Sequence, residues 1–125
     1  MIDVSYENLF RTVYPSLQDG WQKVIIHAAF IEDSCMLKYY IKQADGTYCD
    51  CFGIDCDQRK ILEIIANLHR AIAVVRDSLN EKAKWNAITV VIEADGTFNS
   101  DFDYDAVDWN SAESIKQWTD KYLND

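Results

Sequence analysis

Hydrophobic positions recur along this chain with two different periods, and the period indicates the kind of element. Apolar residues three or four positions apart predict a first helix that ends near Tyr14, where Pro15 follows, a long helix over about residues 58–82, and a closing helix that starts after Ser111. The long helix has the clearest apolar stripe, formed by Ile61, Ile64, Ile65, Leu68, Ile72, Val75 and Leu79. The closing helix has one apolar face, formed by Ile115, Trp118 and Tyr122.

Between the helices the apolar runs are short and of strand length. Residues 21–32, 35–43 and 47–53 predict three strands after the first helix. Residues 85–93 predict a buried strand after the long helix, and a further strand starts at Phe98. The elements therefore follow the order α-βββ-α-ββ-α. This order predicts an α+β fold, an antiparallel β-sheet meander with the helices packed on one side.

Two Asp-Gly turns connect neighbouring strands. Asp45-Gly46 lies between the second and third strands, and Asp95-Gly96 lies between the last two. Asp-Gly between apolar runs is a strong signal for a β-hairpin. The 125 residues include one proline and four glycines, with no linker or low-complexity segment. We therefore expect a single domain over residues 1–125.

The stretch from Phe98 to Trp109 alternates carboxylates with aromatic residues. Successive side chains of a strand point to opposite faces, so Asp101, Asp103 and Asp105 are expected to share one face. The other face carries three aromatic residues, Phe98, Phe102 and Tyr104. We expect the aromatic face to pack on the core and the acidic face to meet solvent, where a negative stripe suits a basic partner surface.

The net charge is concentrated near the C-terminus. The whole chain has a formal net charge of -9, and residues 91–125 hold nine acidic and two basic residues, a net charge of -7. Because phosphate backbones are bound by Lys and Arg, this disfavours direct binding of nucleic acid. It favours a cationic partner, which such a field steers toward the protein. An acidic surface also keeps a small protein soluble, so charge alone leaves both interpretations open.

Signals for export and membrane insertion are missing from the sequence. Residues 1–5 lack the basic and apolar regions of a signal peptide, and the longest apolar runs are too short to span a bilayer. We therefore expect a cytoplasmic protein with no membrane partner.

Four cysteines, Cys35, Cys49, Cys51 and Cys56, are expected to be free thiols in such a compartment. A zinc site that combines them with His27 or His69 is conceivable, but their spacing matches none of the usual paired templates. We therefore predict no metal site and no cofactor. His69 lies beside Leu68 in the long helix and is expected at the edge of its packed face.

The chain contains no complete catalytic motif of the common kinds. Asp101-x-Asp103-x-Asp105 resembles the start of a calcium loop, but Ala106 replaces the glycine of that loop and Ala112 replaces its final glutamate. The chain also lacks a phosphate-binding glycine loop and a Gly-x-Ser-x-Gly elbow. We therefore predict that the protein is not an enzyme and has no catalytic residues. A metal-dependent enzyme that uses the Asp101/Asp103/Asp105 cluster stays as an alternative.

Several motifs in the C-terminal half resemble one protein family. Trp85 opens a strand, Asp95-Gly96-Thr97-Phe98 forms a turn, and Phe102-Asp103-Tyr104-Asp105 follows before a helix that contains Trp118 and Tyr122. This arrangement resembles the YezG-like immunity protein family, most specifically over residues 85–123 and diffusely over nearly the whole chain. The resemblance implies an α+β protein that binds a cognate toxin and blocks it. Toxins of this kind are typically exported by type VII or related interbacterial systems and often end in a nuclease domain.

The resemblance and the charge pattern lead to the same functional hypothesis. We expect an immunity protein, or antitoxin, that neutralises a basic, nuclease-type interbacterial toxin through its acidic surface. The expected toxin-binding residues are Asp101, Asp103, Tyr104, Asp105, Asp108 and Trp109. Tyr104 and Trp109 are included because exposed aromatic residues beside carboxylates make good interface anchors. The alternative is an acidic protein-binding adaptor of another pathway.

Overall fold

The computed structural model describes residues 6–31, 34–54, 57–80, 84–104 and 111–123, and these ranges contain three α-helices and five strands. The elements are α1 (Tyr6–Val13), β1 (Lys23–Ile31), β2 (Ser34–Lys42), β3 (Tyr48–Asp50), α2 (Gln58–Asp77), β4 (Ala87–Glu93), β5 (Phe98–Asp103) and α3 (Ala112–Tyr122). Short 3₁₀ turns occupy Tyr14–Ser16 and Cys51–Gly53. The predicted element order and α+β class are confirmed.

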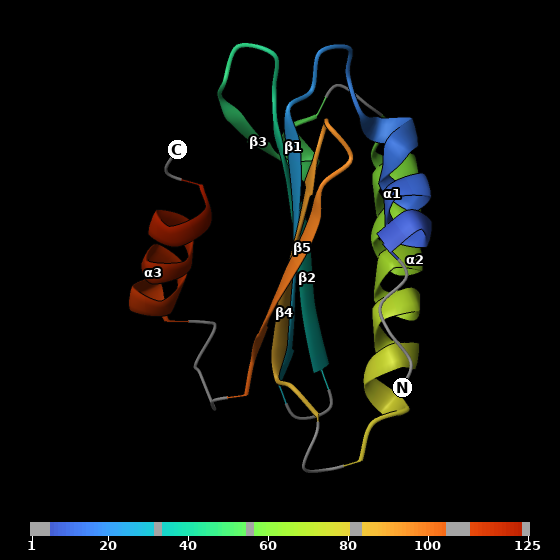
Figure 1. Cartoon of the computed structure of the whole chain (residues 1–125), viewed down its shortest axis with the longest axis vertical. Coiled ribbons are helices and arrows are strands. Elements are labelled where there is room, and N and C mark those ends of the chain that lie inside the picture. The colour runs from blue at the N-terminus through green and yellow to red at the C-terminus, as the bar shows by residue number, and fades with distance from the viewer. Residues whose placement is uncertain (1–5, 32–33, 55–56, 81–83, 105–110, 124–125) are drawn as a thin grey trace.

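The five strands form one antiparallel sheet in the order β3-β2-β1-β4-β5. The first three strands form the predicted meander, and α2 then carries the chain back so that β4 pairs with the free side of β1 (Figure 1). Residues 24–29 of β1 are all buried, which explains its central position. A strand that is apolar at both odd and even positions needs cover on both faces.

Both predicted hairpin turns are present and nearly identical. Gly46 and Gly96 have φ angles of 86° and 94°, a region that glycine enters without strain. The amide of Thr47 donates to Asp45 Oδ1 at 3.0 Å, and the amide of Thr97 donates to Asp95 Oδ1 at 2.9 Å. The repeated Asp-Gly-Thr sequence therefore specifies the same local turn twice.

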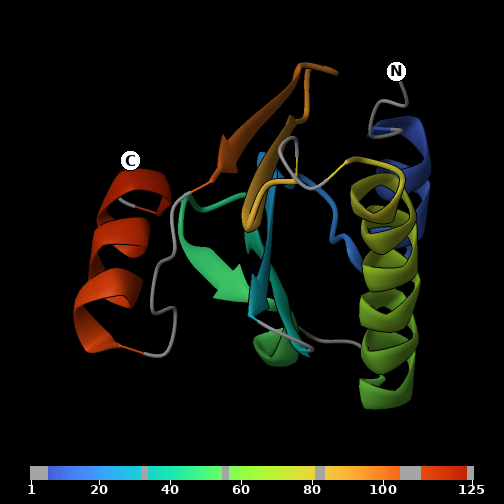
Figure 2. The same ribbon diagram turned by 90° about the horizontal axis from the view of Figure 1, so that it is seen from below.

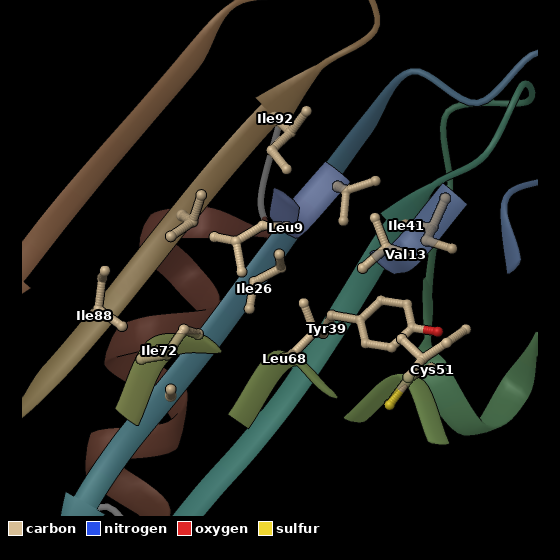
Figure 3. Close-up of a cluster of buried hydrophobic side chains, with 14 of the residues drawn as sticks. Leu9, Val13, Ile26, Tyr39, Ile41, Cys51, Leu68, Ile72, Ile88 and Ile92 are labelled. Atoms are coloured by element: carbon tan, nitrogen blue, oxygen red, sulfur yellow. The ribbon is translucent and has the colours of Figure 1, made fainter. Parts of the chain in front are cut away.

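The main hydrophobic core lies between one face of the sheet and the helices α1 and α2 (Figures 1 and 3). The stripe predicted for α2 supplies Ile61, Ile64, Leu68, Ile72 and Val75, all buried. These pack on alternate strand residues such as Ile26, Tyr39 and Ile88, and Leu9 and Val13 of α1 close the cluster. α2 begins at the side chain of Asp57, which accepts a hydrogen bond from the amide of Arg59 at 3.0 Å.

The closing helix lies on the opposite face of the sheet from α1 and α2 (Figures 1 and 2). The expectation that the helices pack on one side therefore holds for α1 and α2 and is corrected for α3. Trp118 of α3 packs with the second set of alternate strand residues, Ile25, Ala29 and Ala87. The apolar stripe of an amphipathic helix shows that one face must be buried, but both faces of this sheet offered an apolar surface.

Candidate functional site

The acidic and aromatic side chains of β5 lie on opposite faces of the sheet, as predicted. Asp101 and Asp103 pair with Thr89 and Ala87 of β4 and share their face, the one covered by α3. Phe98 and Phe102 lie on the face covered by α1 and α2, because they pair with Ile92 and Ile88 of the main core. The remaining predicted contact residues, Asp105, Asp108 and Trp109, lie outside the described residues.

The aromatic face of β5 is more exposed than expected. Phe98 and Phe102 are 38% and 42% exposed, and Tyr104, directly after the strand, is 58% exposed. Phe102 does contact the core, since its ring centroid lies 5.4 Å from that of Trp85. The expectation that this face packs on the core is therefore correct only in part. The reason is that β5 is an edge strand. Its aromatic side chains have a neighbouring strand, β4, on one side only.

The acidic face of β5 is in turn less open than expected, because α3 lies beside it. The hydroxyl of Tyr122 donates to Asp101 Oδ2 at 2.7 Å. One turn earlier on α3, the indole Nε1 of the buried Trp118 donates to Thr89 Oγ1 at 3.1 Å. The Trp118 ring also stacks on His27, with centroids 4.6 Å apart and planes at 26°. Two aromatic residues with i, i+4 spacing therefore hold α3 on the acidic side of the sheet.

The start of α3 agrees with the sequence prediction. The Oγ of Ser111 accepts a hydrogen bond from the amide of Ser114 at 3.1 Å, and Glu113 lies in the first turn. Both features stabilise a helix N-terminus. This cap sets where α3 begins and therefore which of its residues reach β5.

Burial shifts the pKa values of two side chains between α3 and the sheet, His27 of β1 and Tyr122 of α3. Burial lowers the pKa of His27 to about 4, against a smaller opposing effect of the Asp103 carboxylate. Burial and then the hydrogen bond to Asp101 raise the pKa of Tyr122 to about 12. At neutral pH His27 is therefore uncharged and Tyr122 is a hydrogen-bond donor, so neither offsets the negative charge of Asp101 and Asp103.

A pocket of about 210 Å³ lies between α3 and the strands β4 and β5. Its lining includes Asp101, Asp103, Thr89, Trp118, Lys121 and Tyr122. Carboxylates on one wall and aromatic rings on the other suit a planar or compact cation, such as the guanidinium or ammonium group of a protein side chain. The exposed Lys121 also lines the pocket and offsets part of the negative charge of the two β5 carboxylates.

The described residues contain no group of three or more His, Cys, Asp or Glu side chains arranged to hold a metal ion. Asp105, the third member of the predicted cluster, lies outside them. Cys35, Cys49 and Cys51 are free thiols. Among the described helices, none is both long and apolar enough to cross a membrane.

Sequence reasoning identified the acidic residues of this site but missed the residues that shape it. His27, Thr89 and Lys121 were not predicted to lie near the carboxylates, and Trp118 was predicted only as part of the apolar face of the closing helix. The one available signal was the spacing of Trp118 and Tyr122, which puts both on one side of the closing helix. The strand that this side faces depends on the tertiary structure.

Comparison with known proteins identifies the family of this chain. No curated protein matched the chain. The family model described as "Immunity protein YezG-like" matches residues 2–125, which is nearly the full length and includes every element of the fold described above. The chain therefore belongs to the YezG-like family of immunity proteins.

Proposed function

We propose that this protein binds a cognate toxin and neutralises it through the acidic surface formed by β5 and the adjoining side of α3. The proposal extends the family membership to a mechanism, which is stoichiometric binding without catalysis in the cytoplasm of the cell that makes the protein. The observation that supports it best is the position of Asp101 and Asp103, which line a pocket at the edge of the sheet.

The chemistry of the surface favours a basic partner. A nuclease needs Lys and Arg side chains to hold its phosphate backbone, so an acidic inhibitor competes for the same groups. The net charge of -7 over residues 91–125 adds a long-range field to the local carboxylates. Such a field increases the rate of association, and its effect falls as salt rises. We therefore propose a nuclease-type toxin as the partner.

The proposed contact residues are the six expected from the sequence. Asp101, Asp103 and Tyr104 belong to the described part of the chain, and Tyr104 is the most exposed aromatic residue at the end of β5. Asp105, Asp108 and Trp109 continue the same acidic and aromatic pattern along the sequence. In this proposal the carboxylates steer and orient the toxin, and the aromatic side chains supply most of the buried contact area.

A charge-reversal experiment tests this function. Asp101→Lys combined with Asp103→Lys should weaken binding to the C-terminal domain of the toxin encoded by the neighbouring gene by about tenfold or more at low salt. Calorimetric titration at low and high salt measures the affinity and its salt dependence. Loss of nuclease inhibition should accompany loss of binding, and circular dichroism checks that the variant is folded.

The control is Glu63→Lys, which reverses one charge, where the double variant reverses two, at an exposed position of α2 on the other side of the sheet. It should leave affinity and inhibition close to those of the wild type. Equal affinity of the wild type and the double variant at both salt concentrations would exclude the acidic surface as the interface. Binding without inhibition would indicate an adaptor instead of an immunity protein.

A further inference from the structure

The two edges of the sheet differ in length. The edge strand β3 has three residues, whereas the edge strand β5 has six. Short edge strands offer little to a pairing partner, but a longer edge is a template for another strand unless something covers it. In the described part of the chain, no strand lies beyond β5.

The hydrogen bonds of β5 show which of its backbone groups face away from β4. The carbonyls of Thr97 and Asp103 accept from the amides of Glu93 and Asn86, at 2.9 and 2.6 Å. In an antiparallel ladder the residues that bond to one neighbour alternate with those that face the other side. Asp101 and Asp103 therefore bond toward β4, and the backbone amide of Phe102 between them points to the open edge.

The side chains of β5 determine which types of side chain a strand paired with it must have. Residues of that strand on the α3 face would lie beside Asp101 and Asp103 and the pocket they line. Residues on the other face would lie beside Phe98 and Phe102, which are each more than one-third exposed. A complementary strand therefore alternates basic and apolar side chains.

We propose that an extended segment of the partner, with alternating basic and apolar residues, pairs with β5 as a sixth strand of the sheet. This inference rests on the proposed function, since it specifies how the basic partner is held. A main-chain hydrogen bond from the outward amide of Phe102 supplies affinity, and the alternating side chains supply specificity. The basic side chains of the added strand bind the acidic face of β5, and its apolar side chains pack against the exposed rings of Phe98 and Phe102.

The pocket gives one basic side chain of that segment a defined place. The Oδ2 atom of Asp101 accepts a hydrogen bond from the Tyr122 hydroxyl, and its Oδ1 atom has no hydrogen-bond partner among the described residues. A guanidinium group that enters beside Asp101 meets this oxygen together with the aromatic side chains of Trp118 and Tyr122.

Charge complementarity also argues against a second copy of this chain as the occupant. Two β5 strands paired with each other would bring Asp101 and Asp103 of one copy close to the same carboxylates of the other. Like charges opposite each other in a sheet are destabilising. A basic segment removes this repulsion, whereas self-association increases it.

The decisive comparison is Phe102→Pro against Phe102→Ala. Both variants lose the aromatic ring, but only proline removes the outward amide, and proline is tolerated on an edge strand where its nitrogen faces solvent. Affinity for the toxin domain should be about tenfold lower for the proline variant than for the alanine variant, the effect of one lost main-chain hydrogen bond at an interface. Thermal unfolding confirms that both variants fold.

A second measurement uses the wild-type chain and does not depend on how the variants fold. The Phe102 amide should exchange with solvent hydrogen rapidly in the free protein and slowly in the complex. The Asp101 and Asp103 amides, already bonded to β4, should change less. An unchanged exchange rate at Phe102 in the complex would overturn the strand-pairing inference.

The outcomes separate the inference from the proposed function. If the wild-type chain does not bind the toxin domain, the proposed function fails for that pair and the inference fails with it. If the wild type binds and the two Phe102 variants bind equally well, only the strand-pairing inference fails. Protection of the Phe102 amide that rises with the concentration of this chain alone would identify a second copy at the edge and would also overturn it.

Discussion

The two faces of the sheet have different cores. The face under α1 and α2 packs against the twenty residues of α2 and carries a continuous aliphatic cluster that includes Val24, Ile26 and Ile88. Among the described residues, the hydrophobic cluster under the eleven-residue α3 consists of the buried Ile25, Ala29, Ala87 and Trp118, next to the buried polar residues His27 and Thr89. The first face therefore supplies most of the hydrophobic stabilisation, and the second has polar groups and a pocket beside the proposed binding edge.

This difference also predicts where the molecule opens most easily. Local stability follows the amount of buried apolar contact. Among the described residues 111–123, Trp118 alone is buried, Tyr122 and Leu123 are partly buried, and Ile115 is half exposed. The proposed acidic surface therefore adjoins the face that has fewer buried apolar side chains among the described residues.

The largest expected effect is on stability, when one buried side chain is removed from each face of the sheet. Leu68→Ala removes a fully buried side chain from the main core and should lower the free energy of unfolding by about 2–5 kcal/mol. Trp118→Ala should release α3, with loss of amide protection confined to residues 112–122 and a smaller decrease in the global free energy. Denaturant titration and hydrogen exchange measure the two effects. Equal global losses would show that both faces belong to one cooperative core.

The second prediction concerns the pH dependence of the unfolding free energy that His27, on the α3 face, should cause. Because burial lowers the pKa of His27 from 6.5 to about 4, the unfolded chain binds a proton more readily than the folded one between these values. Stability from the neutral imidazole is fully present above pH 6.5 and is lost as the pH falls to 4, by about 3 kcal/mol in total.

The variant His27→Gln isolates this effect, because the carboxylates that titrate over the same range are common to both proteins. Above pH 6.5 the unfolding free energies of the wild type and the variant should differ by a constant amount. Below it the wild type should lose stability relative to the variant. Parallel curves down to pH 4 would mean that the imidazole is not buried as described.

The smallest expected effect concerns the contact between α3 and the acidic edge. Tyr122→Phe removes the hydroxyl that donates to Asp101 and should cost about 0.5–1.5 kcal/mol, toward the lower end because Asp101 is exposed. Tyr14→Phe is the matched control, since the exposed Tyr14 hydroxyl has no hydrogen-bond partner among the described residues. A cost at Tyr122 no greater than at Tyr14 would remove this hydrogen bond from the attachment of α3.

Local features of the fold were predictable from the sequence because their causes are local. The Asp-Gly-Thr turns, the end of α1 before Pro15 and the Ser111 cap each depend on a few consecutive residues. The apolar stripe of α2 and the alternation along β5 depend only on the helix and strand periods. The same reasoning placed Asp101 and Asp103 on one face, and the short motifs pointed to the family that the full-length match then showed.

Side-chain environments that depend on distant segments were decided only by the tertiary structure. A strand with two apolar faces does not specify which face a later helix will cover, so the position of α3 opposite α1 and α2 was not readable from its stripe. That position brings Trp118 onto His27 and Tyr122 onto Asp101 and so forms the pocket. Strand order likewise decided that β5 is an edge, which leaves Phe98 and Phe102 exposed. Their sequence pattern is the same in an edge strand and in a central one, because periodicity records which face a residue is on and not what lies beside it.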